Sequence, residues 1–259
     1  MDKECFINEF LDFTKSLKSY VSDQCDNWSI KGFIDIHKNI FTISNDTKIV
    51  SKILEIHIFP VIEKFANSID FDVVLADCQN YYPDISFVYR KNPKIKYAID
   101  IKTTYRKTSD LCNGFTLGSH GEYFRNRTSK KNIQYPYGEY NGHFCLGIIY
   151  TRNNEVNEMS FSSIDNLDKI TSVIKDIDCF FVEKWKIAND ISGSGNTANI
   201  GSITKINDIM NGRGIFVKYG EEIFDDYWIN YGKITITDKN GKIKKITKLK
   251  EFLEYRGIK

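Results

Sequence analysis

Apolar residues recur at the spacing of an α-helix near the start of the chain. Between residues 4 and 20 they include Phe6, Phe10 and Leu17, which fall on one face of a helix. Polar and charged residues occupy the remaining positions. This stripe predicts an amphipathic helix that buries one face against the core.

A second helix is predicted over residues 47–69, where Asp46 precedes the periodic segment and is suited to be its N-cap. Pro60 lies inside the segment, so we expect either a kink or two shorter helices. Further along the chain, residues 220–231 have the pattern of a helix, and residues 160–176 are partly helical in pattern.

Short runs of branched and aromatic residues between turn residues predict strands. Residues 28–44 alternate in part between apolar and polar positions and are interrupted at 37–39, which indicates a hairpin. The stretch 191–202 is rich in Gly, Ser and Asn and is predicted to be a loop. Five further strands are predicted at 72–75, 85–89, 97–103, 144–150 and 178–182. We therefore predict one domain over residues 1–259, of the α/β (α+β) class, with a mixed central sheet flanked by helices.

The composition is that of a folded protein. The chain has 259 residues, of which 41% are hydrophobic and 14% aromatic, enough for a sizeable core and too many for a disordered chain. Apolar runs such as 145–150 are far shorter than the roughly 20 residues that cross a bilayer. No basic segment followed by an apolar one begins the chain. We expect a cytoplasmic protein without a membrane partner.

The net charge of +2 argues against a nucleic-acid partner only while it is averaged over the whole chain. Residues 90–131 contain eleven basic and three acidic residues, a balance of +8. Residues 231–259 contain nine basic and three acidic residues, a balance of +6. Two basic segments on an acidic body are compatible with a surface that faces phosphates, although each segment alone is also typical of a solvated face.

The segment 81–105 brings acidic and basic residues together. Two predicted strands flank a turn at 91–94, so an antiparallel hairpin pairs positions whose numbers sum to about 185. Asp84 then lies opposite residue 101, next to Asp100. Because side chains alternate along a strand, Asp100 and Lys102 share one face while their apolar neighbours point into the core.

Carboxylates on an otherwise apolar strand are costly unless they are paired or bind a metal. Carboxylate oxygens suit Mg²⁺, which activates water and polarises phosphates. Lys102 is suited to orient a water or to offset charge on a phosphate. The alternative is a plain Asp–Lys ion pair at a strand end, with Pro83-Asp84 closing a turn.

Pro83-Asp84 followed by Asp100-Ile-Lys102 resembles the PD-(D/E)xK nuclease superfamily. An ordered series of segments from about residue 28 to 231 resembles its EcoRV-like type II restriction endonucleases more closely. These segments are Asp46-Thr-Lys48 with Glu55, Asn80-Tyr-Tyr-Pro-Asp84, Ala98-Ile-Asp-Ile-Lys-Thr-Thr-Tyr105, Phe115-Thr-Leu-Gly118, Tyr150-Thr-Arg152, Ser192-Gly-Ser-Gly-Asn-Thr197, Asn199-Ile-Gly-Ser202 and Asp226-Tyr-Trp228. The resemblance implies a restriction-endonuclease-like core over the whole chain, with 81–105 as its catalytic hairpin.

The resemblance also implies roles for individual residues. Asp84 and Asp100 would bind Mg²⁺, Lys102 would lie beside the attacking water, and Glu55 would be an auxiliary catalytic and metal-binding acid. An ordinary solvated helix glutamate is the alternative for Glu55.

DNA contacts are implied as well. Within the recognition loop 191–202, glycines allow a close approach to base edges, and an Asn amide suits adenine. A plain flexible loop is the alternative, and a dinucleotide site is disfavoured because the βαβ context is missing. The implied base contacts are Gly193, Ser194, Gly195, Asn196, Thr197 and Asn80. The implied backbone or minor-groove contacts are Gln79, Ser51, Thr104, Lys130, Arg152, Lys233 and Thr235.

A palindromic target needs a two-fold symmetric reader, so we expect a homodimer on double-stranded DNA. By resemblance the hairpin 28–44 is the dimer element, although its apolar residues could equally fill the core of the monomer. The basic tail 231–259 extends the phosphate contacts. The expected target is GATATC, cut to blunt ends with 5′-phosphates, and a protective DNA methyltransferase is the expected functional partner. A repair or junction-cleaving nuclease and a non-catalytic DNA-binding relative are the alternatives.

Overall fold

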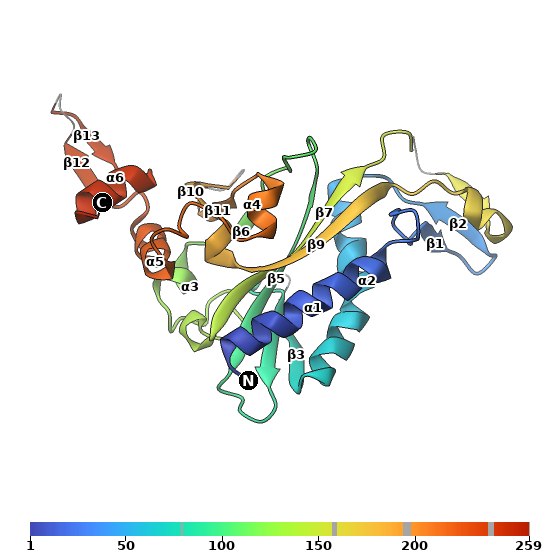
Figure 1. Cartoon of the computed structure of the whole chain (residues 1–259), viewed down its shortest axis with the longest axis horizontal. Coiled ribbons are helices and arrows are strands. Elements are labelled where there is room, and N and C mark those ends of the chain that lie inside the picture. The colour runs from blue at the N-terminus through green and yellow to red at the C-terminus, as the bar shows by residue number, and fades with distance from the viewer. Residues whose placement is uncertain (79, 157–159, 194–197, 238–240, 259) are drawn as a thin grey trace.

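The computed structural model describes residues 1–78, 80–156, 160–193, 198–237 and 241–258. Its centre is a five-stranded sheet in the order β3-β4-β5-β7-β9 (Figure 1). Its strands are β3 (Phe71–Leu75), β4 (Ile85–Tyr89), β5 (Lys96–Tyr105), β7 (Gly142–Arg152) and β9 (Ile174–Glu183). Strands β5 and β7 are parallel and the other neighbours are antiparallel, so the predicted mixed sheet and all five of its strands are confirmed.

The register of the β4–β5 hairpin differs by one position from the prediction. Ile85 pairs with Ile99, which places Asp84 opposite Asp100 and not opposite residue 101. The difference arises in the turn, because Tyr89 N donates to Ile95 O across 3.0 Å and so centres the loop on Asn92. The two carboxylates are therefore aligned more directly than the sequence indicated.

Two long helices, α1 (Lys3–Val21) and α2 (Thr47–Ser68), cover one face of this sheet (Figure 1). Asp46 caps α2 as predicted, since its side chain accepts from Lys48 N at 2.9 Å. Of the two alternatives at Pro60, the division into two shorter helices is wrong, because α2 runs through the proline as one helix, and the kink stays a prediction. Ile58 and Ile62, on either side of Pro60, are fully buried and hold both halves of the helix in the core. Among the described residues, no helix is long and apolar enough to cross a membrane.

The core between these helices and the sheet is aromatic. Phe6 stacks on Tyr97 with ring centres 4.0 Å apart, and Phe10 stacks on Phe181 at 4.1 Å. These rings come from α1, β5 and β9, so the first helix is fixed against the strand that carries the acidic residues.

The opposite face of the central sheet is covered by smaller elements. A second sheet in the order β10-β11-β6 consists of β10 (Ala188–Ser192), β11 (Asn199–Ser202) and β6 (Thr116–Ser119). Three helices accompany it, α3 (Glu122–Arg125), α4 (Ile206–Met210) and α5 (Glu221–Asn230). The chain ends in β12 (Thr235–Thr237), β13 (Ile243–Lys245) and α6 (Leu249–Arg256).

The predicted loop 191–202 is partly wrong, because both of its ends are strands. Asn199 pairs with Ser119 of β6, and Ile200 pairs with Ser192 of β10. The polar composition concealed these strands, which pair with each other and, through β11, with the distant strand β6. The helix predicted over 220–231 is confirmed as α5.

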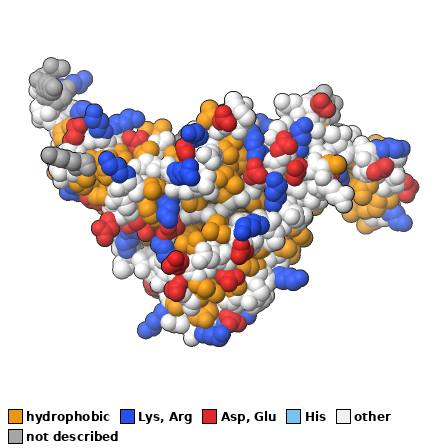
Figure 2. Space-filling model, in the orientation of Figure 1, with side chains coloured by type: hydrophobic (Ala, Val, Ile, Leu, Met, Phe, Trp, Pro, Cys, Tyr) orange, Lys and Arg blue, Asp and Glu red, His pale blue; other side chains and the backbone are white. Residues whose placement is uncertain are grey.

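The predicted hairpin within 28–44 is confirmed as β1 (Gly32–Ile34) and β2 (Asn39–Thr42), and β8 (Phe161–Ser163) adds a third strand. It lies at the opposite end of the molecule from the C-terminal elements, and hydrophobic side chains are visible on this lobe (Figures 1 and 2). Ile40 and Ile43 are buried, so part of the hairpin does fill the monomer core. Its exposed apolar residues are Phe33, Ile34, Ile36, Phe41 and, from β8, Phe161.

The segment 160–176, predicted as partly helical, contains a 3₁₀ helix over Ile164–Lys169 between β8 and the start of β9. The helical prediction therefore holds only for its middle. Its two ends are extended because each pairs with another strand, β8 with β2 and β9 with β7.

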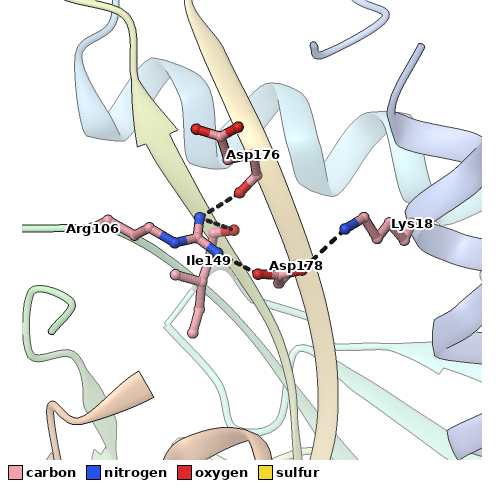
Figure 3. Close-up of polar contacts among 5 residues, drawn as sticks. All are labelled: Lys18, Arg106, Ile149, Asp176 and Asp178. Atoms are coloured by element: carbon pink, nitrogen blue, oxygen red, sulfur yellow. Dashed lines mark hydrogen bonds and ion pairs between the residues drawn. The ribbon is translucent and has the colours of Figure 1, made fainter. Parts of the chain in front are cut away.

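One arginine joins three strands at the end of the central sheet. Arg106 follows β5 and donates to the carbonyl oxygens of Ile149 and Asp176 and to the carboxylate of Asp178 (Figure 3). Lys18 of α1 approaches the same carboxylate at 3.1 Å. The β7–β9 register shifts here, and the guanidinium satisfies carbonyls where the ladder is irregular.

Candidate active site

Strand β5 presents charged side chains on one face and apolar core side chains on the other. Ile99 and Ile101 are buried in the core beneath the long helices, while Asp100 and Lys102 point to the opposite side. Asp100 is only 5% exposed. Lys102 Nζ lies 2.9 Å from Asp100 Oδ2, which is an ion-pair contact.

Asp84 joins this pair from the end of β4. The β4–β5 pairing stops at Ile85, and the side chain of Asp84 takes over by accepting from Ile101 N at 2.7 Å. This hydrogen bond holds the carboxylate against β5, beside Asp100. Burial, followed by the charge of Asp100, raises the pKa of Asp84 to about 7.

At Lys102 the neighbouring charges favour the charged form of the side chain. Burial alone would lower its pKa, but the charges of Asp100 and Asp84 hold that pKa above the ordinary lysine value. The ammonium therefore stays protonated at neutral pH and cannot readily remove a proton from water. Its arrangement suits an electrostatic or orienting role.

The two carboxylates fit a divalent cation. The raised pKa of Asp84 reflects two negative groups held together out of water, and a cation between them would relieve that repulsion. Asp100 Oδ2 is buried, and the ammonium of Lys102 lies 2.9 Å from it, so a cation at this oxygen would share it with Lys102. Asp84 and Asp100 are thus the residues that would hold such an ion.

Glu55 is not brought into contact with this pair. Its carboxylate forms an ion pair with Lys52 at 2.9 Å, one turn earlier on α2. Within the described ranges, no group of three or more His, Cys, Asp or Glu side chains is close enough to hold a metal. Glu55 does line the same cleft as Asp84, so it faces the site from the other wall.

Two hollows meet at these residues. A cleft of about 1290 Å³ runs between the first half of α2 and the β4–β5 hairpin. A smaller, more polar pocket of about 300 Å³ lies on the other side, between the acidic pair and strands β6 and β11. Asp84 and Lys102 line both, so the charged group stands where a polymer lying in the cleft would meet the pocket.

The residues predicted to contact the DNA backbone differ in their surroundings. Ser51 lines the large cleft, and its hydroxyl is hydrogen-bonded to that of Thr103. Thr104 is buried, and its hydroxyl donates to Asn113 O at 2.6 Å, so in this conformation it is already satisfied. The guanidinium of Arg152 lies 3.5 Å from the centre of the Tyr105 ring.

The remaining cationic and polar contacts lie at the surface. Lys130 is exposed after α3, and Lys233 and Thr235 are exposed at the start of the C-terminal segment. Gln79 lies outside the described residues.

The base of the predicted recognition loop adjoins the smaller pocket. Gly193 N donates to Asn199 O, and a Cβ on Gly193 would come within 2.6 Å of the Thr116 side chain. Asn80, Thr116 and Asn199 line the pocket together with the acidic pair. Ser194, Gly195, Asn196 and Thr197 lie outside the described residues.

Several residues of this site were not predicted. Tyr82, Tyr123 and Asn132 line the pocket, and Lys184 lies buried behind it. Lys184 had a usable signal, since two charged residues, Glu183 and Lys184, stand between the apolar run of β9 and Trp185. Tyr82 and Tyr123 had no such signal in the sequence, because aromatic residues are common throughout the chain.

The family model for restriction endonuclease EcoRV matches residues 24–257. The chain belongs to the EcoRV restriction endonuclease family. The type II restriction enzyme EcoRV of Escherichia coli is 37% identical over 239 residues, which are 92% of this chain and 95% of that protein. Every candidate residue lies inside the matched range, and so does nearly all of the basic tail.

A solved structure, that of the NlaIV restriction endonuclease, is similar over 88% of this chain and 87% of its own. The identity is 13% and the TM-score 0.44, so membership of the EcoRV family rests on the sequence matches.

Proposed function

We propose that this protein is a Mg²⁺-dependent type II site-specific deoxyribonuclease that cuts both strands of DNA. The observation that carries the proposal is the convergence of Asp84, Asp100 and Lys102 at the junction of a long cleft and a polar pocket, in a member of the EcoRV family. A cleft of this kind admits a polymer, and the charged group is equipped for hydrolysis of a phosphodiester.

The residues have distinct parts in the reaction. Asp84 and Asp100 would hold the cation, which when bound polarises the phosphate as a Lewis acid and makes water more acidic. Lys102 orients the attacking water and offsets the charge that builds on the phosphate. The water oxygen forms the new P–O bond, the P–O3′ bond breaks, and O3′ takes up a proton. The products are a 3′-hydroxyl and a 5′-phosphate.

Glu55 is proposed as an auxiliary acid. In the metal-free protein its charge is matched by Lys52, so joining the cation would require that pair to separate. The proposal is supported by the place of Glu55 on the cleft wall facing Asp84.

The proposed target is GATATC, cut to blunt ends. Support comes from the loop between β10 and β11, because its base shares strand β6 with the pocket that contains the acidic pair. Gly193 to Thr197 and Asn80 would read base edges. Gln79, Ser51, Thr104, Lys130, Arg152, Lys233 and Thr235 are the proposed backbone and minor-groove contacts.

A homodimer is proposed, with the hairpin 28–44 at its interface. Phe33, Ile34 and Ile36 are 56%, 59% and 92% exposed. Apolar side chains exposed side by side on a projecting element are typical of an interface. A methyltransferase of the same specificity is the proposed functional partner.

The test is cleavage of a plasmid that contains one GATATC site, with Mg²⁺ present. We expect a single linear product with blunt 5′-phosphorylated ends, and no product from a plasmid in which one base pair of the site is changed. Asp84→Asn should abolish cutting, while the matched exposed change Asp72→Asn should not. Cleavage of branched DNA in preference to the site would contradict the proposal, as would full activity of Asp84→Asn.

A further inference from the structure

Lys184 is a buried cation that the proposed chemistry does not use. It lies at the junction of β9 and the short 3₁₀ helix Lys184–Ile187, and it is 1% exposed. Its Nζ makes no hydrogen bond with any residue that the structure describes. An unpaired charge buried in this way costs free energy, so its retention calls for a compensating role.

The ammonium lies inside a cage of aromatic rings. Nζ is 4.6 Å from the centre of the Tyr82 ring, 5.2 Å from that of Tyr137 and 5.5 Å from that of Phe124. The ring faces stabilise a cation but cannot replace its lost hydration completely. Burial accordingly lowers the pKa of Lys184 to about 8, and the charges of Asp100 and Asp225 limit the fall.

The cage is also the back wall of the catalytic pocket. Tyr82, Gly118 and Tyr123 line that pocket with Asp100 and Lys102. A Cβ on Gly118 would lie 3.6 Å from Lys184 Nζ and 3.3 Å from the Tyr123 hydroxyl. Lys184 therefore lies directly behind the wall of the pocket that the acidic pair lines.

The charges on the two sides of this wall balance. When both carboxylates are ionised, Asp84 and Asp100 contribute two negative charges, while Lys102 and Lys184 contribute two positive ones. Asp225, the other acidic group that acts on Lys184, is already paired with Arg127 at 2.8 Å. Of the two carboxylates that act on Lys184, Asp100 is thus the one that belongs to the catalytic pair.

We propose that Lys184 is a positioning residue whose charge, acting through the pocket wall, weakens the grip of Asp84 and Asp100 on the divalent cation and favours the more negative transition state. The inference rests on the proposed function. A site with net charge near zero binds a divalent cation less tightly than a site with net charge −1. The same positive charge stabilises the phosphate most when its negative charge is greatest.

Lys184→Met tests this, because methionine keeps most of the length and removes the charge. Binding of Mn²⁺ alone, without DNA, is measured by electron paramagnetic resonance, and cleavage is measured in a single turnover at saturating Mg²⁺. We expect Mn²⁺ to bind about fivefold more tightly and cleavage to slow about tenfold. Thermal stability should not fall, since a desolvated charge has been removed.

The opposite directions of the two changes identify the electrostatic role. A purely structural lysine would give weaker binding and slower cleavage together, with a lower melting temperature, and that result would overturn the inference. Unchanged Mn²⁺ affinity would overturn it too. Phe124→Leu is the matched control, because it damages the same cage without removing charge and should leave Mn²⁺ affinity unchanged. Lys184→Arg should restore both properties toward the original values.

Failure of the proposed function has a different signature. If Asp84→Asn leaves Mn²⁺ binding of the otherwise unchanged protein intact, the metal site itself is wrong. If Asp84→Asn removes binding while Lys184→Met leaves it unchanged, only the inference about Lys184 fails.

Discussion

The two faces of the central sheet do different work. Toward α1 and α2 the sheet buries a continuous apolar cluster with stacked aromatic rings, such as Phe6 on Tyr97. Toward β6, β10 and β11 it also buries ionisable groups, among them Asp100, His143 and Lys184. Both faces bury apolar clusters that stabilise the fold, and the second face also holds a charged site, whose burial costs free energy of folding.

Strand β5 shows how closely the two roles are joined. Successive residues alternate between the faces, so Ile99 and Ile101 anchor the strand while Asp100 and Lys102 are displayed. The position of the carboxylate is therefore fixed by packing on the opposite side. Substitutions on the two faces should separate activity from stability, and four of them test this.

The largest effect is expected for Asp100→Asn. It removes one of the two proposed ligands and should reduce the single-turnover cleavage rate at least about a thousandfold. The melting temperature should stay the same or rise, because two buried carboxylates no longer repel. A large loss of stability would show that Asp100 serves the fold, which contradicts the division between faces.

Phe6→Ala is the converse change on the other face. Loss of a fully buried ring that contacts several aromatic neighbours should lower the free energy of unfolding by about 4 kcal/mol. Denaturant unfolding measures this loss. The folded fraction should keep its cleavage rate at low temperature, and a large fall in that rate would mean that the faces are not separable.

Gly147→Ala tests how tightly side chains are packed on the face of the sheet that holds the charged site. Gly147 pairs with Lys102 in the sheet, and a Cβ there would lie 1.9 Å from the ring of Phe180. We expect a loss of about 2 kcal/mol of stability from this overpacking. Phe180→Leu in the same chain should recover part of it, and no recovery would place the strain elsewhere.

The smallest effect concerns pH in the absence of metal. Because the pKa of Asp84 is raised to about 7, the folded protein holds a proton that the unfolded chain loses near pH 4. The resulting stabilisation is complete below the unfolded pKa and is lost as pH rises through about 7. In EDTA the melting temperature should fall between pH 5 and pH 8, and this fall should be shallower in Asp84→Asn. Equal slopes would contradict the raised pKa.

The apolar face could be predicted from sequence because its signals are local. The spacing of Phe6, Phe10 and Leu17 defined α1, and Asp46 marked the start of α2. The β4–β5 hairpin could also be predicted, since antiparallel strands joined by a short turn have few possible registers. The error of one position came from the hydrogen bonds of the turn, which spacing does not determine.

The other face depends on long-range contacts, and there the sequence was less informative. Strands β10 and β11 have polar sequences and pair with each other, and β11 also pairs with the distant strand β6. The burial of Lys184 is set by neighbours from separate elements, such as Tyr82, whereas Glu55 pairs with Lys52 of its own helix. A motif identifies which residues are present in such a site but not which of them are already paired.

The cluster around Arg106 bears on how the protein behaves at high concentration. Strand β9 is one of the two edges of the central sheet, and near its start Lys175 pairs with Asn27. Where such an edge is left open, it can pair with a strand from another molecule. Arg106, Asp178 and Lys18 place three charges beside that edge (Figure 3). Since charged edges resist such pairing, the contacts that secure the strand ends also protect the sheet from aggregation.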